Sequence, residues 1–237
     1  MKRGELKSYI RILADELTEA PEGLFLDTEL DLLINISQQN VAVALAPFIP
    51  WAITKTFLIS TTINKREYEI AVDFSVDDFF MMQGIFHNEA GNQPKELIFL
   101  ERDQVIQYRI IGETGEPKAW SWKSAGVIAL DPTPSATVAE KYEGVYVPLF
   151  KDLNDDAIHD PVTSKYAIPF NGSTILTPTH PLIAAEVLKQ WAIRAGGEAG
   201  DIDTMYDRIR ESVLFTMTQA QGITHRGRPN ITEIIKT

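Results

Sequence analysis

The chain has 237 residues, of which 44% are hydrophobic, and it contains no cysteine. A hydrophobic core of ordinary size is therefore possible, whereas disulfides, thiolate zinc sites and cysteine nucleophiles are excluded. Thirty-three Asp and Glu against 22 Lys and Arg give a net charge of −11, which argues against a surface that wraps around nucleic acid phosphates.

Two helices are predicted in the first 50 residues. In the first, apolar residues recur at helical spacing from Leu6 to Leu17, and the sequence APEG at 20–23 ends the helix. The second follows from about residue 28, where Thr28 and Asp31 have the spacing of a capping box. Pro47 and Pro50 are expected to end it.

Strands are predicted from residue 54 onward, where β-branched residues become frequent and apolar residues alternate with others. A short helix is expected at 101–108, and a polar, proline-containing connection at 151–172. Residues 131–134, which contain Pro132 and Pro134, are interpreted as a hairpin turn, because proline pre-sets φ and ends strand pairing. The predicted strands cover 56–63, 68–74, 79–87, 97–99, 119–123, 127–130 and 137–147.

Two further helices are predicted near the C-terminus. The first has Thr179 as N-cap, Pro181 in its first turn and Gly196 as its stop. The second starts at Asp201 and carries an apolar stripe that reaches Met217.

This order of elements predicts an α+β fold in which the N-terminal and C-terminal helix pairs form one helical bundle, because neither pair can bury its apolar stripe alone. An antiparallel β-sandwich or barrel-like domain is inserted between the pairs. The predicted domains are 1–53 (N-terminal helices), 54–172 (inserted β domain), 173–221 (C-terminal helices) and 222–237 (tail).

No complete catalytic apparatus is recognisable, so we expect a protein that is not an enzyme and has no catalytic residue, metal or cofactor. Sequence motifs for a nucleophile elbow, a phosphate-binding loop and a dinucleotide-binding loop are absent. Asp77 and Asp78 would point to opposite faces of a strand, and the carboxylates from Asp201 onward fit a helix start better than a cation site. The histidines are scattered and form no metal-binding spacing: His87, His159, His180 and His225.

Trp120 and Trp122 share one face of a predicted strand. They form either part of the hydrophobic core, which is the favoured interpretation, or a platform on which a sugar stacks. Two exposed, coplanar indoles would indicate the carbohydrate function.

The apolar stretches are too short to cross a membrane, since a spanning helix needs about 20 apolar residues and the longest run, 41–53, contains two prolines. The N-terminal stretch reaches Glu5 and Asp15 before any apolar segment typical of a signal peptide. We therefore expect a protein that is neither secreted by that route nor anchored in a membrane.

The tail at 222–237 differs in charge from the remainder of the chain: it carries +2, and the other 221 residues carry −13. Three isoleucines among its last seven residues are unusual for free disorder. We expect the tail to become ordered on a partner. The expected contact residues are Arg226, Arg228, Ile231, Ile234 and Ile235.

Several stretches, taken in order, resemble one protein family. They are LDTELDLLINISQQNVAVAL, REYEIAVDF, GEPKAWSW, IALDPTPSATVAEKYEG and THPLIAAEVLKQWAIRAGG, and the likeness covers about residues 6–217. Together they are similar to the bacteriophage head-to-tail adaptor, or neck, proteins of the tail tubular protein A (gatekeeper) type of short-tailed phages.

The resemblance implies a structural protein of the virion, assembled in the host cytoplasm as a ring, expected to be a dodecamer, beneath the portal protein. The ring would join the head to the tail nozzle and line the conduit through which DNA is ejected, without specific DNA binding. An acidic wall suits such a conduit, because it does not hold phosphates. The family also implies that the C-terminal segment reaches toward the portal. The alternatives are a carbohydrate-binding or carbohydrate-cleaving β-sandwich component of a phage tail, and an oligomeric scaffold unrelated to phage.

Overall fold

The computed structural model divides the chain into two compact units. The helical unit comprises Met1–Ala52 and Phe150–Thr237, and the β unit comprises Ile53–Leu149. The inserted segment thus ends at Leu149 in this division and at 172 in the sequence prediction. The chain is α+β: its long helices and its mainly antiparallel strands lie in separate stretches, and the one-turn helix α4 (Ile70–Asp73) lies among the strands. The structure describes residues 1–18, 26–87, 94–101, 103–105, 113–150, 169–170, 173, 175–194 and 200–220.

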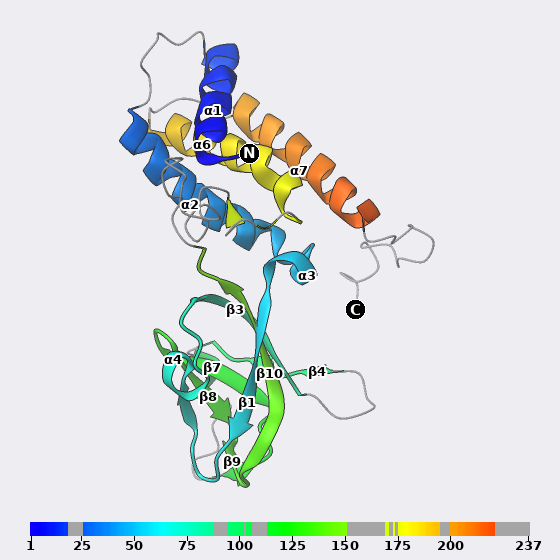
Figure 1. Cartoon of the computed structure of the whole chain (residues 1–237). Helices are drawn as coiled ribbons and strands as arrows, with labels where there is room; N and C mark the ends of the chain where they lie inside the picture. The colour runs from blue at the N-terminus through cyan, green and yellow to red at the C-terminus, as the bar shows by residue number, and fades with distance from the viewer. Residues whose placement is uncertain are drawn as a thin grey trace, which may run out of the picture. The chain divides into compact units, whose positions relative to one another are not determined.

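In the helical unit, α6 is the central element, since it contacts α1, α2 and α7 (Figure 1). Each of these helices buries an apolar stripe, such as Leu6, Ile10 and Ala14 on α1. The four long helices predicted from apolar spacing are confirmed. The elements are α1 (Arg3–Thr18), α2 (Asp27–Leu45), α3 (Pro50–Ile53), the 3₁₀ turn η3 (Thr177–Thr179), α6 (His180–Arg194) and α7 (Gly200–Ala220).

The start of α2 differs from the prediction. Its N-cap is Leu26, which makes no side-chain capping bond, so the capping box expected at Thr28 and Asp31 is wrong. Asp31 instead forms ion pairs with two cations of α1: Arg3 Nε donates to Asp31 Oδ1 at 2.7 Å, and Lys7 Nζ lies 2.7 Å from the same oxygen. A charged partner competes better for the carboxylate than the orphan amides of the helix start do.

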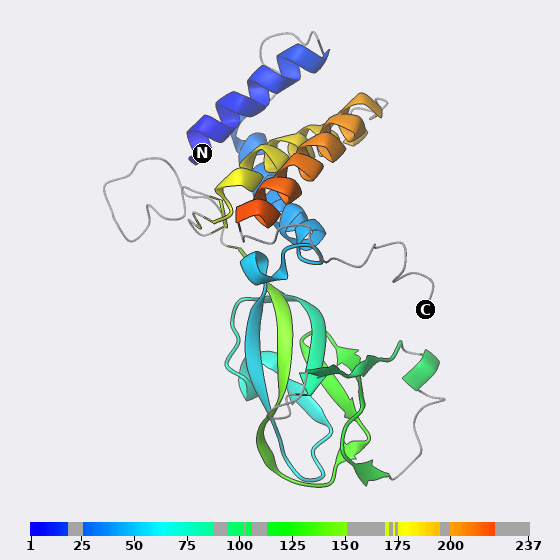
Figure 2. The ribbon, with the colours of Figure 1, turned by 90° about the vertical axis from the view of Figure 1, so that its right-hand side faces the viewer.

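The β unit contains two larger sheets (Figure 2). One has the order β1-β10-β3-β4 and is antiparallel throughout; the other has the order β2-β8-β7-β5, in which only β5 and β7 run parallel. Strands β6 and β9 form a short parallel pair. The elements are β1 (Lys55–Thr61), β2 (Glu67–Glu69), α4 (Ile70–Asp73), β3 (Phe79–His87), β4 (Lys95–Glu96), β5 (Ile98–Phe99), β6 (Thr114–Gly115), β7 (Ala119–Ser124), β8 (Val127–Asp131), β9 (Thr133–Pro134) and β10 (Val138–Pro148).

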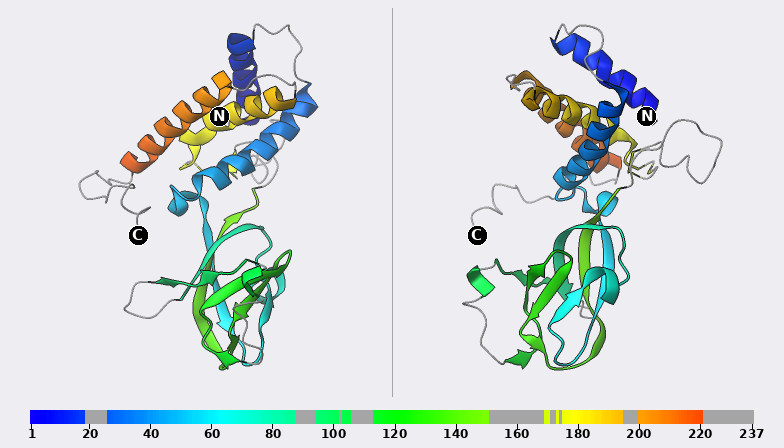
Figure 3. Two further views of the ribbon diagram at one scale, coloured as in Figure 1. Left: turned by 180° about the vertical axis from the view of Figure 1, so that it is seen from behind. Right: turned by 90° about the vertical axis from the view of Figure 1, so that its left-hand side faces the viewer.

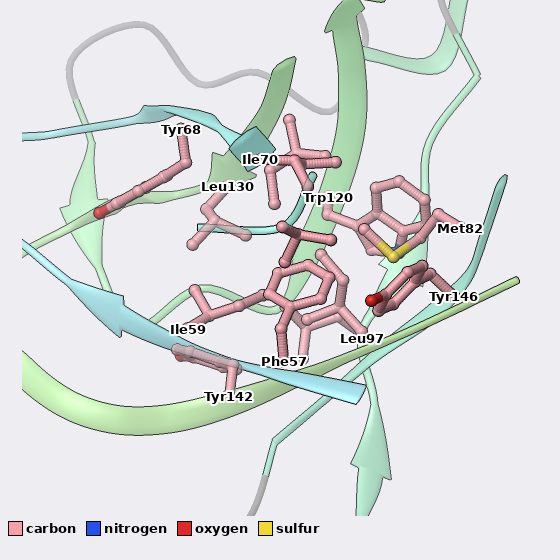
Figure 4. Packing of buried hydrophobic residues seen from close by; sticks show 13 residues of the cluster. Phe57, Ile59, Tyr68, Ile70, Met82, Leu97, Trp120, Leu130, Tyr142 and Tyr146 are labelled. Carbon is pink, nitrogen blue, oxygen red and sulfur yellow. The ribbon is translucent and has the colours of Figure 1, made fainter. Parts of the chain in front are cut away.

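Side chains from both larger sheets meet in one aromatic core (Figure 4). On β1 and β10, alternate residues point inward, and Phe57 lies opposite Gly144 in the register. Gly144 leaves room for the Phe57 ring between Tyr142 and Tyr146, which flank it on the same face of β10. The cluster consists of Phe57, Ile59, Tyr68, Ile70, Val76, Met82, Ile85, Leu97, Trp120, Ile128, Leu130, Tyr142 and Tyr146.

The strand predicted at 68–74 is wrong in its second half, since β2 ends at Glu69 and α4 forms one helical turn. Asp73 explains the change. Its Oδ2 accepts a hydrogen bond from the backbone N–H of Glu69 at 2.8 Å, and its other oxygen pairs with Lys65. This local bond gives the backbone an alternative to the sheet ladder.

The hairpin turn predicted at 131–134 is also wrong, because β8 and β10 belong to different sheets. The Asp131–Pro132 peptide is cis, and the residues that follow form β9, which pairs with β6. Arg66 holds the corner: its Nε donates to Asp131 Oδ1 at 3.1 Å, and its terminal nitrogen donates to Oδ2 at 2.9 Å. The segment is a crossover from one sheet to the other. Figure 3 shows the β unit from two further sides.

Candidate functional site

The tail residues expected to contact a partner lie outside the described residues, as do His159 and His225. The positions concerned are Arg226, Arg228, Ile231, Ile234 and Ile235. The candidate site therefore consists of groups within the described residues.

The main polar site of the helical unit is a buried group that we call the glutamine clasp, formed by Gln38, Gln39, Phe150 and Phe170. Gln39 Oε1 accepts a hydrogen bond from the Phe150 N–H at 3.1 Å, and Gln38 Oε1 accepts one from the Phe170 N–H at 3.0 Å. The two phenylalanine rings lie 5.1 Å apart, edge to face. The backbones of Phe150 and Phe170, which are 20 residues apart in the chain, are thus both bound to adjacent glutamines of α2.

The clasp follows from the position of its amides within an apolar helix. Gln38 is 1% exposed and Gln39 8% exposed, between buried apolar residues of α2. A buried amide is costly unless its polar atoms are bonded, and backbone outside helices and sheets has N–H groups in need of acceptors. Each such bond contributes about 1 kcal/mol, and losing one partner costs more.

Phe170 adopts a backbone conformation that is uncommon for an aromatic residue. Its φ is 57°, in the left-handed region, although the side chain is almost fully buried. Such a conformation persists only where the surroundings hold it. Among the described residues, the contacts that do so include the bond to Gln38, the ring contact with Phe150, and a bond from the Ser173 N–H to the Phe170 carbonyl at 3.1 Å.

His180 lies beside the clasp, its ring stacked on that of Phe170 with centroids 6.4 Å apart. The side chain is 1% exposed. Its Nδ1 accepts a hydrogen bond from the amino group of Met1 at 2.7 Å, whereas Nε2 finds no hydrogen-bond partner among the described residues. Burial, and after it the charge of that amino group, lowers the pKa of His180 to about 4, so the ring is neutral at pH 7.

The residue before His180 does not cap α6, so this prediction is wrong. Thr179 belongs to η3, and its hydroxyl donates to the carbonyl of Leu176 at 2.7 Å. The fully buried hydroxyl is satisfied within this turn, which leads directly into α6.

In the β unit, Trp120 is 4% exposed and belongs to the core cluster, which confirms the favoured interpretation for this residue. Trp122 is 39% exposed, and its ring is 5.7 Å from that of Trp120 at an interplanar angle of 77°. The two indoles are neither both exposed nor coplanar. They do not form the stacking platform that would indicate carbohydrate binding.

Two of the carboxylates noted in the sequence, Asp78 and Asp203, have cationic or phenolic partners. Asp78 pairs with Lys55 and accepts a hydrogen bond from the Tyr146 hydroxyl at 2.8 Å, and Asp203 pairs with Lys189 at 2.8 Å. Burial alone would raise the pKa of Asp78, but the bonds from Lys55 and Tyr146 outweigh it and lower the pKa. Within the described ranges, no three His, Asp or Glu side chains are grouped so that they could hold a metal ion.

Large apolar side chains remain exposed on both units. Such side chains are candidates for contact with other proteins when they gather on one surface. In the helical unit they include Ile12, Leu32, Phe48, Trp51, Ile193 and Phe215, and in the β unit Leu58, Phe80, Ile98, Phe99 and Trp122.

The glutamine clasp was not predicted from the sequence, although the sequence contains a feature that indicates it. Gln38 and Gln39 interrupt the apolar side of a helix that otherwise buries leucine, isoleucine, valine and alanine. Two adjacent amides in such a place indicate bonds to irregular backbone, but not which backbone.

No helix in the described part of the chain is both long and apolar enough to span a bilayer. The sequence matches no model of a protein family and no curated protein.

Proposed function

We propose that the protein is a structural head-to-tail adaptor of a bacteriophage, which forms an oligomeric ring beneath the portal and joins the head to the tail. In this proposal the helical unit is a four-helix bundle that builds the ring, and the β unit is a sandwich-like or barrel-like insertion that contacts the next tail component. DNA passes through the lumen without specific binding. The resemblance described above motivates the proposal.

The division of the chain into a helical unit and a β unit is the observation that most directly supports the proposal. Helices from both ends belong to one unit, in which α6 contacts α1, α2 and α7, and 97 intervening residues form a separate β unit. A chain of this kind presents two different surfaces from one subunit. Two distinct surfaces suit a subunit that meets its neighbours head to tail and a further partner as well, because ring contacts are heterologous.

Charge is the second support. A net charge of −11 repels phosphates, so a ring of such subunits allows DNA to slide rather than bind. Exposed apolar side chains on both units are a third support, because contacts between subunits need desolvated apolar groups at their centre.

Native mass spectrometry of the purified chain, alone and mixed with the portal protein of the same phage, tests the proposal. We expect a ring, with twelve copies as the family implies, that forms on the portal and appears as a collar in negative-stain images. A chain that stays monomeric with the portal, or that binds sugars and ignores the portal, contradicts the proposal.

A charge-matched pair of variants tests the contribution of the tail. Arg226→Ala with Arg228→Ala removes two positive charges from the tail, and Lys95→Ala with Lys118→Ala removes two from exposed positions of the β unit. We expect only the first pair to weaken docking on the portal. Equal docking by both double variants would remove the tail from the proposed contact.

A further inference from the structure

His180 connects separate segments of the helical unit through one buried ring. It is the first residue of α6, it stacks on Phe170 of the clasp, and it accepts a hydrogen bond from the amino group that precedes α1. Among the residues that the structure describes, the charged groups that act on it are this amino group and Glu5 of α1. The clasp amides on α2 and the Thr179 hydroxyl in η3 are uncharged.

These contacts suit only the neutral form of the ring. Since Nδ1 accepts a hydrogen bond from an ammonium group, the neutral ring carries its proton on Nε2. A second proton would go to Nδ1, which would then face another donor at 2.7 Å. Two positive charges would lie side by side, one of them on a ring that is almost fully buried, and the low pKa of His180 reflects this.

Phe170 depends on this ring more than Phe150 does. Phe170 is the clasp residue that has a left-handed backbone and contacts the imidazole. Loss of the imidazole from its place removes a contact from a residue whose conformation is unfavourable without support. Phe150 has no such conformation, and its N–H is held by the other glutamine.

We infer that His180 is a pH-sensitive switch for the glutamine clasp. The neutral ring supports Phe170, and protonation displaces the ring and frees the Phe170 N–H from Gln38. The Phe150 side of the clasp is held longer, because Gln39 does not depend on the imidazole. The switch therefore opens the clasp from one side.

Amide hydrogen exchange of the untagged, full-length protein measures this directly, because the two clasp donors are backbone amides. Protection factors are taken relative to the intrinsic exchange rate at each pH, from pH 7 to pH 3.5, and His180 is followed by its ring NMR signals. We expect the protection of Phe170 to fall at least tenfold, with a midpoint that coincides with the titration of the His180 ring. Amides of β10 in the β unit, such as Tyr142, report whether the rest of the fold persists.

Two variants separate His180 from other acid-sensitive groups, including Glu5. In His180→Gln, the amide oxygen can still accept the bond from the amino group but does not titrate, so the protection of Phe170 should vary less than twofold. The control is His87→Gln in the β unit, which should behave like the parent. An equal loss of protection in His180→Gln, or constant protection in the parent down to pH 3.5, overturns the inference. If His180→Gln does not fold, midpoints for the ring and the Phe170 amide that differ by more than about one pH unit overturn it.

Discussion

Substitution of Gly144 by alanine tests how the core of the β unit is packed. A methyl carbon at this position would lie 2.5 Å from Cε1 and 3.0 Å from Cε2 of Phe57, and closer still to Cζ. Unstrained carbon contacts are about 3.5–4.0 Å, so the ring must move by about 1 Å or more. It cannot do so freely, because Phe74 and Tyr146 lie 5.0 and 5.8 Å from it, centroid to centroid.

Two effects of opposite sign set the magnitude. Overpacking of a dense core costs about 1–3 kcal/mol. Replacing a glycine within a strand recovers about 0.5–1 kcal/mol, because alanine loses less backbone freedom on folding. Since the clash involves three ring atoms of a buried side chain, overpacking dominates, and we expect Gly144→Ala to lower the free energy of unfolding of the β unit by about 1–2 kcal/mol.

The assay must report on the β unit alone, because a chain of two units need not unfold in one step. Hydrogen exchange of β10 amides in rising urea meets this need. Gly84→Ala is the matched control in the same sheet, where the added carbon would make milder contacts, with the end of the flexible Glu96 side chain at 3.0 Å and with the Phe86 ring at 3.1 Å. Adding Phe57→Leu to Gly144→Ala should remove most of the clash. If Gly144→Ala is as stable as the parent, or if Phe57→Leu gives no relief beyond its own cost, the packing described here is incorrect.

Three further outcomes follow from charged groups. Arg66→Met leaves the buried carboxylate of Asp131 without its cation and should destabilise the β unit by about 3 kcal/mol in urea unfolding, whereas an effect under about 0.5 kcal/mol would contradict the role of this pair. The pKa of Asp78 is lower in the folded protein than in the unfolded chain, so its carboxylate stabilises the fold above the unfolded pKa of about 4, and this stabilisation is lost as the pH falls through the folded pKa. Asp78→Asn should therefore lower the free energy of unfolding by about 1 kcal/mol at pH 7 and should flatten the dependence of stability on pH below about 4. Arg226→Ala with Arg228→Ala should leave the circular dichroism spectrum unchanged and weaken portal binding at least tenfold in co-sedimentation, and unchanged binding would refute the proposed tail contact.

The elements that the sequence predicted well are those in which an apolar period repeats over several turns or residue pairs. The predicted apolar stripe of α1 corresponds to a buried face that includes Leu6 and Ile10, and the segment predicted at 137–147 is the strand β10, in which Tyr142, Gly144 and Tyr146 are buried in alternation. Burial of a repeated apolar face dominates the energetics of such segments, so the pattern and the structure agree.

Short segments around single polar groups were predicted poorly. Asp73 ends β2 by bonding to the backbone of Glu69, and Asp31 serves the cations of α1 instead of capping α2. In each case the residue type was compatible with more than one partner. The choice depends on which cation or amide the tertiary fold brings near, and this cannot be read from spacing along the chain.

The corner at Asp131 is a crossover between two sheets, although the sequence predicts a hairpin turn there. Proline in a strand context ends pairing, and this part of the prediction agrees with the structure. A hairpin additionally requires that the strands on both sides pair with each other, whereas here β8 pairs with β2 and β7, and β10 pairs with β1 and β3. The corner is held by two buried hydrogen bonds from Arg66 to Asp131, and Arg66 lies 65 positions earlier in the chain. A hydrogen bond within a tight turn does not hold it. The corner therefore joins the two sheets of the β unit, so its stability should follow that of the whole unit rather than that of a local hairpin.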